Sequence, residues 1–167
     1  MARVIEGLAA GIEPELTTHS HPVLGNATWN IGTIQGGSAV NVVPDVCEIE
    51  IDRRLIPGET ANDVIQHVDA VLRELRDSYP DLRVEHDQPF VDLPAIHTAA
   101  SQPIVQAAQR SVAAIGIPSI PEAVAYATDA AMLSGIGGIP AVVLGPGNIA
   151  QAHTSNEWIA LDQLEQA

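Results

Sequence analysis

The chain has 167 residues, of which 46% are hydrophobic and 17% are charged, a balance typical of folded globular proteins. Acidic residues outnumber basic ones 21 to 7, so the net charge of -14 argues against nucleic acid and anionic membranes as partners. The single cysteine excludes an internal disulfide, and no apolar run approaches the roughly 20 residues that a membrane-spanning helix needs. We therefore expect a cytoplasmic protein with no nucleic-acid or membrane partner.

The chain opens with a predicted helix. Val4, Ile5 and Leu8 recur at helical spacing, and Gly11 and Pro14 are expected to end the helix. Extended structure is predicted next, over residues 27–35, followed by a glycine-rich bend over residues 36–44.

A second strand is predicted over residues 46–54, where apolar and acidic residues alternate. Its apolar face includes Cys47, which we interpret as a buried hydrophobic residue rather than a reactive thiol.

A long helix follows, because Thr60 and Asp63 resemble a capping box ahead of an apolar stripe, and Pro80 ends it. Residues 82–90 read as a further strand. The order α-β-β-α-β predicts an α+β, ferredoxin-like domain of the split βαβ kind that lacks its first strand. We place a domain boundary near Leu93, which divides the chain into residues 1–93 and 94–167.

The second part has an α/β pattern. Ser101-Gln102-Pro103 begins a predicted helix that runs to Ile115. Residues 141–144, Ala-Val-Val-Leu, predict a strand buried on both faces of a sheet. The loop that follows, residues 145–157, would lie at the carboxyl end of that strand, where open α/β sheets bind ligands.

That loop contains His153, which small residues precede and which is the best candidate metal ligand in the chain. The alternative is a surface histidine without a role, because one histidine does not make a metal site. Thr128 begins a predicted helix, whose N-terminus either is simply capped or also binds a substrate anion. Asn41 and Arg54 offer an amide and a guanidinium for a carboxylate, or else are an ordinary turn residue and a solvated strand end.

Three stretches carry a family resemblance: GTIQGGSAVNVVPDVCEIEIDRRLIPGE at 32–59, YATDAAML at 126–133 and IPAVVLGPGNIAQAHTSNEWI at 139–159. In content, order and separation they resemble the zinc metallohydrolases that include acetylornithine deacetylase, succinyl-diaminopimelate desuccinylase, aminoacylase and carboxypeptidase G. The last stretch is most similar to the acetylornithine deacetylase branch.

The resemblance implies an amidohydrolase that uses zinc or cobalt and cleaves N-acyl amino acids or small peptides. It implies that residues 1–93 are most of a lid domain that forms a homodimer, and that residues 94–167 end an α/β catalytic domain. His153 matches a metal ligand; Asn41 and Arg54 match lid residues at the substrate carboxylate; Thr128, Gly147 and Asn148 match backbone-rich substrate positions.

The same resemblance places the general base and the other metal ligands upstream of this sequence. We therefore expect the isolated chain to be inactive and to bind no zinc stably. Two alternatives remain open: a stand-alone dimerisation or interaction module derived from such an enzyme, and a complete small hydrolase built on His153, Asp129 and Thr128. The sequence offers no nucleophile elbow or triad in support of the second.

Overall fold

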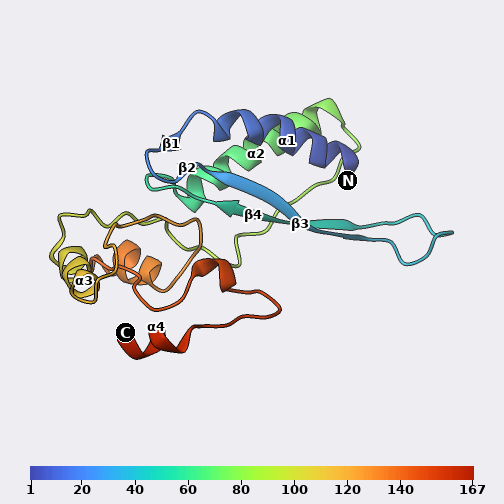
Figure 1. Cartoon of the computed structure of the whole chain (residues 1–167). Coiled ribbons are helices and arrows are strands. Elements are labelled where there is room, and N and C mark those ends of the chain that lie inside the picture. Colours follow the sequence, from blue (N-terminus) through green and yellow to red (C-terminus); the bar gives the residue numbers. More distant parts are fainter.

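The computed structural model describes residues 1–167, and its first half is a two-helix layer over an antiparallel hairpin (Figure 1). The elements of this half are α1 (Ala2–Leu16), β1 (Ser20–His21), β2 (Gly25–Asn26), β3 (Thr28–Gly36), β4 (Cys47–Arg54) and α2 (Ala61–Ser78). β1 pairs with β2 and β3 pairs with β4, both antiparallel, so the predicted β-β-α succession is confirmed and a short β1–β2 hairpin is added to it.

A bulge at Gly32 sets which residues of β3 face the helices. Ile31 pairs with Ile51 and Ile34 pairs with Ile49, although a spacing of three along a regular strand would put Ile31 and Ile34 on opposite faces. The extra residue in β3 restores the phase, so the apolar residues of both strands share one face. On the opposite face the Thr33 hydroxyl donates to Glu50 Oε2 over 2.9 Å.

The core of this half lies between α1 and α2 and continues onto the sheet. It consists of five buried residues, Val4, Leu8, Ile12, Val71 and Leu72, against which Trp29 and Ile49 of the sheet pack. The hairpin extends beyond the two helices in Figure 1, and Cys47 at its far end is half-buried rather than buried as expected.

The predicted end of α1 at Gly11 and Pro14 is wrong, because the helix continues to Leu16. Gly11 instead permits close packing of the helices: a Cβ there would lie 2.4 Å from Val71 Cγ2. Burial of one face against α2 outweighs the low helix propensity of glycine, which costs about 1 kcal/mol. Pro14 has no N–H to donate to the preceding turn, and the helix ends two residues after it, at Leu16.

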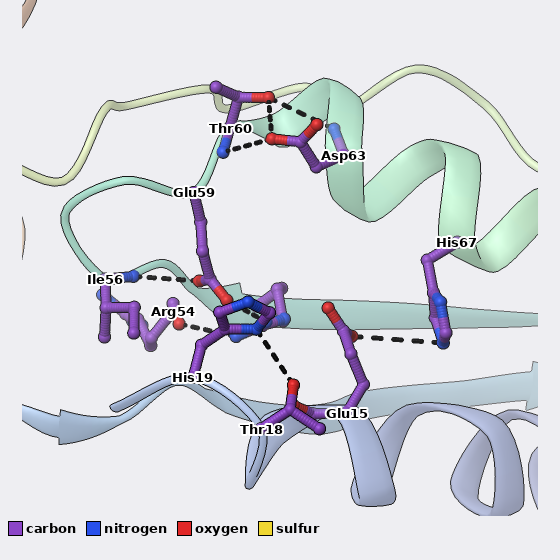
Figure 2. Close-up of polar contacts among 10 residues, drawn as sticks. Glu15, Thr18, His19, Arg54, Ile56, Glu59, Thr60, Asp63 and His67 are labelled. Atoms are coloured by element: carbon purple, nitrogen blue, oxygen red, sulfur yellow. Dashed lines mark hydrogen bonds and ion pairs between the residues drawn. The ribbon is translucent and has the colours of Figure 1, made fainter. Parts of the chain in front are cut away.

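The capping box of α2 is confirmed. Asp63 N–H donates to Thr60 Oγ1 over 3.2 Å, and Thr60 N–H donates to Asp63 Oδ2 over 3.0 Å (Figure 2). The helix ends at Ser78, before Pro80, as the sequence predicts.

The predicted strand over residues 82–90 is not formed. Leu82 and Val84 pack against the core, but the segment has no strand pairing, and side chains of α2 hold it instead. The Arg76 guanidinium donates to the Val84 carbonyl, and His86 Nε2 lies 2.8 Å from Asp69 Oδ1. An extended segment needs a backbone partner to become a strand, and no other segment pairs with this one.

The second half contains little regular structure and few buried residues. Its elements are the α-helices α3 (Pro103–Ala114) and α4 (Leu161–Gln166), the π-helical turn η1 (Met132–Ile136) and the 3-10 helical turn η2 (Ile149–Gln151). The helix predicted from Ser101 is confirmed as α3, with Pro103 at its first position, and only Val105 and Ala131 are buried in this half.

The predicted buried strand over residues 141–144 is wrong. Ala141 is half-buried, but the other three side chains are solvent-exposed, with exposed fractions of 57% for Val143 and 58% for Leu144, and the segment forms no strand. An apolar run becomes a central strand only between two neighbouring strands, which this chain does not place beside it. Among the helices, none combines the length and the apolar composition that spanning a membrane requires.

Candidate functional site

Arg54 is the last residue of β4 and lies on the face of the hairpin that turns away from the helices, because strand side chains alternate. Its Nε donates to Asp52 Oδ2 over 2.6 Å, and the two side chains are 49% and 54% exposed. The guanidinium is therefore accessible to a carboxylate ligand, which would have to displace or share the partner it already has.

Asn41 lies in the loop at the other end of the hairpin. Arg54 pairs with Thr28 at the base, and Cys47 pairs with Gly36 next to the loop. The seven steps from Cys47 to Arg54 along β4, at roughly 3.3 Å each, separate the two ends by about 23 Å. One copy of the chain therefore does not bring Asn41 and Arg54 to a common carboxylate.

The loop around His153 is held by contacts within the second half. His153 has φ of 60°, a left-handed backbone that is uncommon outside glycine, and its N–H donates to Glu157 Oε2 over 3.2 Å. Gly147 N–H donates to Gln163 Oε1 over 3.0 Å, and Asn148 Oδ1 accepts from Ala150 N–H over 2.9 Å. His153 itself is exposed, so its imidazole is free to meet a ligand.

Thr128 begins the helical turn that leads into η1. Its Oγ1 accepts a hydrogen bond from Ala130 N–H over 3.2 Å, as expected for a helix start, and the residue is half-buried. Capping accounts for this contact fully.

The chain's own residues do not fit a complete zinc centre. No group of three or more His, Cys, Asp or Glu side chains is placed to hold a metal ion. A catalytic zinc takes three protein ligands, so His153 could supply one of them and the others would have to come from other polypeptide.

Comparison with known proteins relates the first half of the chain to a known domain family. Residues 1–80 match the family model described as "Peptidase dimerisation domain", of the M20 family. Over almost all of its length, the first half of the chain is similar to the dimerisation domain of M20 peptidases. The similarity to known enzymes continues past it, so the chain as a whole is homologous to acetylornithine deacetylases.

The relatives are longer than this chain. The acetylornithine deacetylase of Edwardsiella ictaluri is 35% identical over 136 residues, which are 81% of this chain and 33% of that protein. The one from Myxococcus xanthus is 30% identical over 159 residues, which are 95% of this chain and 37% of that protein. The chain thus spans about a third of the length of the curated relatives it matches.

A solved structure confirms the fold class. A tripeptidase from Staphylococcus aureus superposes with a TM-score of 0.63 and 22% identity, over 95% of this chain and 42% of that chain. The mixed α/β fold class is therefore confirmed and is consistent with a partial lid, although the strands over residues 82–90 and 141–144 are not formed.

Two polar pairs of the dimerisation domain are not predicted from the sequence. The Arg53 Nη2 lies 3.1 Å from Glu59 Oε1, and His86 Nε2 lies 2.8 Å from Asp69 Oδ1. One feature of the sequence indicates the first pair: Arg53 is charged although the alternation of β4 places it on the apolar face with Ile49 and Ile51. No such feature indicates the second pair, since it depends on how residues 82–90 return to α2.

The contact with Asp69 raises the pKa of His86 above its usual value, with help from the Asp87 carbonyl and against partial burial and the nearby Arg76. The protonated imidazole is therefore favoured in the folded state. Its stabilising contribution is complete below pH about 6.5 and is lost as the pH rises through the folded-state pKa.

We expect His86→Gln to destabilise the dimerisation domain by up to about 1 kcal/mol at pH 5.5 and by less at pH 8, because the pair is partly exposed. Urea unfolding at the two pH values measures this. Asp69→Asn should give the same pH dependence, and adding it to His86→Gln should change little further. Equal losses at both pH values would contradict the assignment.

Proposed function

We propose that this chain supplies the lid and dimerisation domain, residues 1–93, and the C-terminal part of the catalytic domain, residues 94–167, of a cytoplasmic, metal-dependent amidohydrolase. Its substrates are N-acyl amino acids such as N-acetylornithine. The observation that carries the proposal is the extent of the similarity to acetylornithine deacetylases, which covers up to 95% of the chain and so continues well beyond the dimerisation domain.

Within this proposal, Arg54 binds the carboxylate of the substrate, in keeping with its accessible guanidinium at the end of β4. Asn41 contributes an amide from the hairpin loop of the second copy, since one copy does not bring it to the carboxylate that Arg54 binds. His153 is one ligand of a zinc or cobalt ion. Thr128 and the Gly147-Asn148 segment present backbone groups to the substrate. The metal, when bound, would polarise the scissile carbonyl and activate water.

The dimerisation domain pairs two copies of the chain. Each β3–β4 hairpin has unpaired edges, and an open edge can add a strand from a second copy. The isolated chain is inactive in this proposal, because His153 alone cannot complete a catalytic metal centre.

A second candidate is a stand-alone dimerisation or interaction module. One observation favours it: seven of the nine buried residues precede residue 73, so this half has a core of its own. This candidate predicts a folded dimer with no role for Arg54 or His153.

A chimera tests the first proposal against the second. The chain replaces the matching third of the Myxococcus xanthus acetylornithine deacetylase, and N-acetylornithine hydrolysis and zinc content are measured. We expect turnover, a zinc content lowered by His153→Ala, and a KM raised at least about tenfold by Arg54→Ala, since one charge-assisted hydrogen bond contributes roughly 1.5–3 kcal/mol.

Exposed Arg83, which has no predicted contact with substrate, supplies the matched control, and Arg83→Ala should leave the KM unchanged. A folded, dimeric chimera whose zinc content and KM are insensitive to both site variants would favour the interaction module. The unmodified chain assayed alone should neither retain zinc nor hydrolyse N-acetylornithine, and turnover there would contradict the proposal.

A further inference from the structure

Arg53 occupies an unusual place in the dimerisation domain. It follows Ile49 and Ile51 on the apolar face of β4, and its side chain is only 9% exposed. The guanidinium makes two contacts: Nη1 donates to the Arg54 carbonyl over 2.9 Å, and Nη2 donates to Glu59 Oε1 over 3.1 Å. One buried side chain thus joins the main chain at Arg54 to the turn that follows the strand.

Glu59 completes the connection by closing that turn. Its Oε2 accepts the Ile56 N–H over 3.0 Å, and its own N–H donates to the Ile56 carbonyl over 3.0 Å. Pro57 and Gly58 form the turn, with Gly58 at φ of 103°, as a type II turn requires at its third position. Figure 2 shows Glu59 reaching back to Ile56.

Stability alone does not account for this arrangement. The Nε of Arg53 is buried and has no hydrogen-bond partner, which costs free energy. Replacing a buried ion pair by apolar side chains of similar size is often neutral or stabilising. The contacts instead constrain geometry, because they fix the carbonyl of Arg54 from one side of the sheet while its guanidinium projects from the other.

We propose that the Arg53–Glu59 pair positions Arg54 for the substrate carboxylate. The inference rests on the proposed function, in which Arg54 contacts that carboxylate. Arg53 and Glu59 touch no substrate and are positioning residues. They hold the end of β4 and the Pro57–Gly58 turn as one unit, so the Arg54 guanidinium meets its ligand with its main chain already fixed.

The test uses the full chain, labelled with ¹⁵N, in two separate readouts. The first follows the Nε–H signal of Arg54, which reports its contact with Asp52 without any ligand. The second titrates N-acetyl-L-ornithine and fits the dissociation constant. The variants are Arg53→Met, which keeps an apolar stem in the buried position, and Glu59→Gln, which keeps an oxygen for the Ile56 N–H. Arg83→Met is the control.

We expect both variants to shift and broaden the Arg54 Nε–H signal and to weaken binding about tenfold, with little change in Tm, whereas Arg83→Met changes neither. An unaltered Arg54 signal in folded Arg53→Met and Glu59→Gln overturns the proposal, whatever the titration gives. The proposed function is tested separately by Arg54→Ala in the chimera, where an unchanged KM contradicts it, and the first readout still decides the role of the Arg53–Glu59 pair.

Discussion

Leu72→Ala is expected to lower the free energy of unfolding of the dimerisation domain by about 3 kcal/mol, which lies within the range for leucine truncations in protein cores. Leu72 is 2% exposed and lies in the cluster formed with Val4, Leu8, Ile12 and Val71. The loss combines the transfer free energy of the removed atoms with a cavity that two packed helices can close only partly. Since small domains have about 5–15 kcal/mol in total, the effect is large.

Urea unfolding followed by far-ultraviolet circular dichroism measures it, and the midpoint should fall while the slope is preserved. Leu164→Ala is the matched control: the same truncation removes a side chain that is 53% exposed on α4 and should change stability by less than about 0.5 kcal/mol. Similar losses for the two leucines would mean that the core does not lie between α1 and α2.

The first half of the chain could be predicted well because its signals are local. The alternation at Cys47–Arg54 and the capping box at Thr60 specify a strand and a helix from neighbouring residues alone. The error at Gly11 has a tertiary cause, since its missing side chain makes room for Val71. Residues 82–90 have strand-like composition, but pairing is a long-range property that composition does not determine.

The second half was harder to predict, because buried strands depend on neighbours. Residues 141–144 have the composition of a central strand, yet Val143 and Leu144 are more than half exposed. The candidate site could likewise be predicted only where its signals are local. Arg54 and His153 could be identified from motifs, but the separation of Asn41 from Arg54 and the Arg53–Glu59 contact follow from the register of the hairpin, which no motif states.

Amide hydrogen exchange should divide the chain sharply into a protected and an unprotected part. Amides in the middle of α2 should exchange more slowly than those of residues 118–127 by a factor on the order of 10³, since core amides open only with global unfolding. Residues 118–127 form no hydrogen bonds between backbone groups, and only two residues of the second half are buried. Mass spectrometry of peptic fragments measures the contrast.

The exchange rates of the α3 amides test whether burial or helix formation governs protection. α3 has regular helical hydrogen bonds but buries only Val105, so its amides should exchange at intermediate rates if tertiary burial, and not helix formation, governs protection. If residues 118–127 were as protected as α2, a second copy of the chain would have to cover them. Repeating the exchange at tenfold lower protein concentration distinguishes that case, because protection that depends on a partner decreases on dilution and protection from an internal core does not.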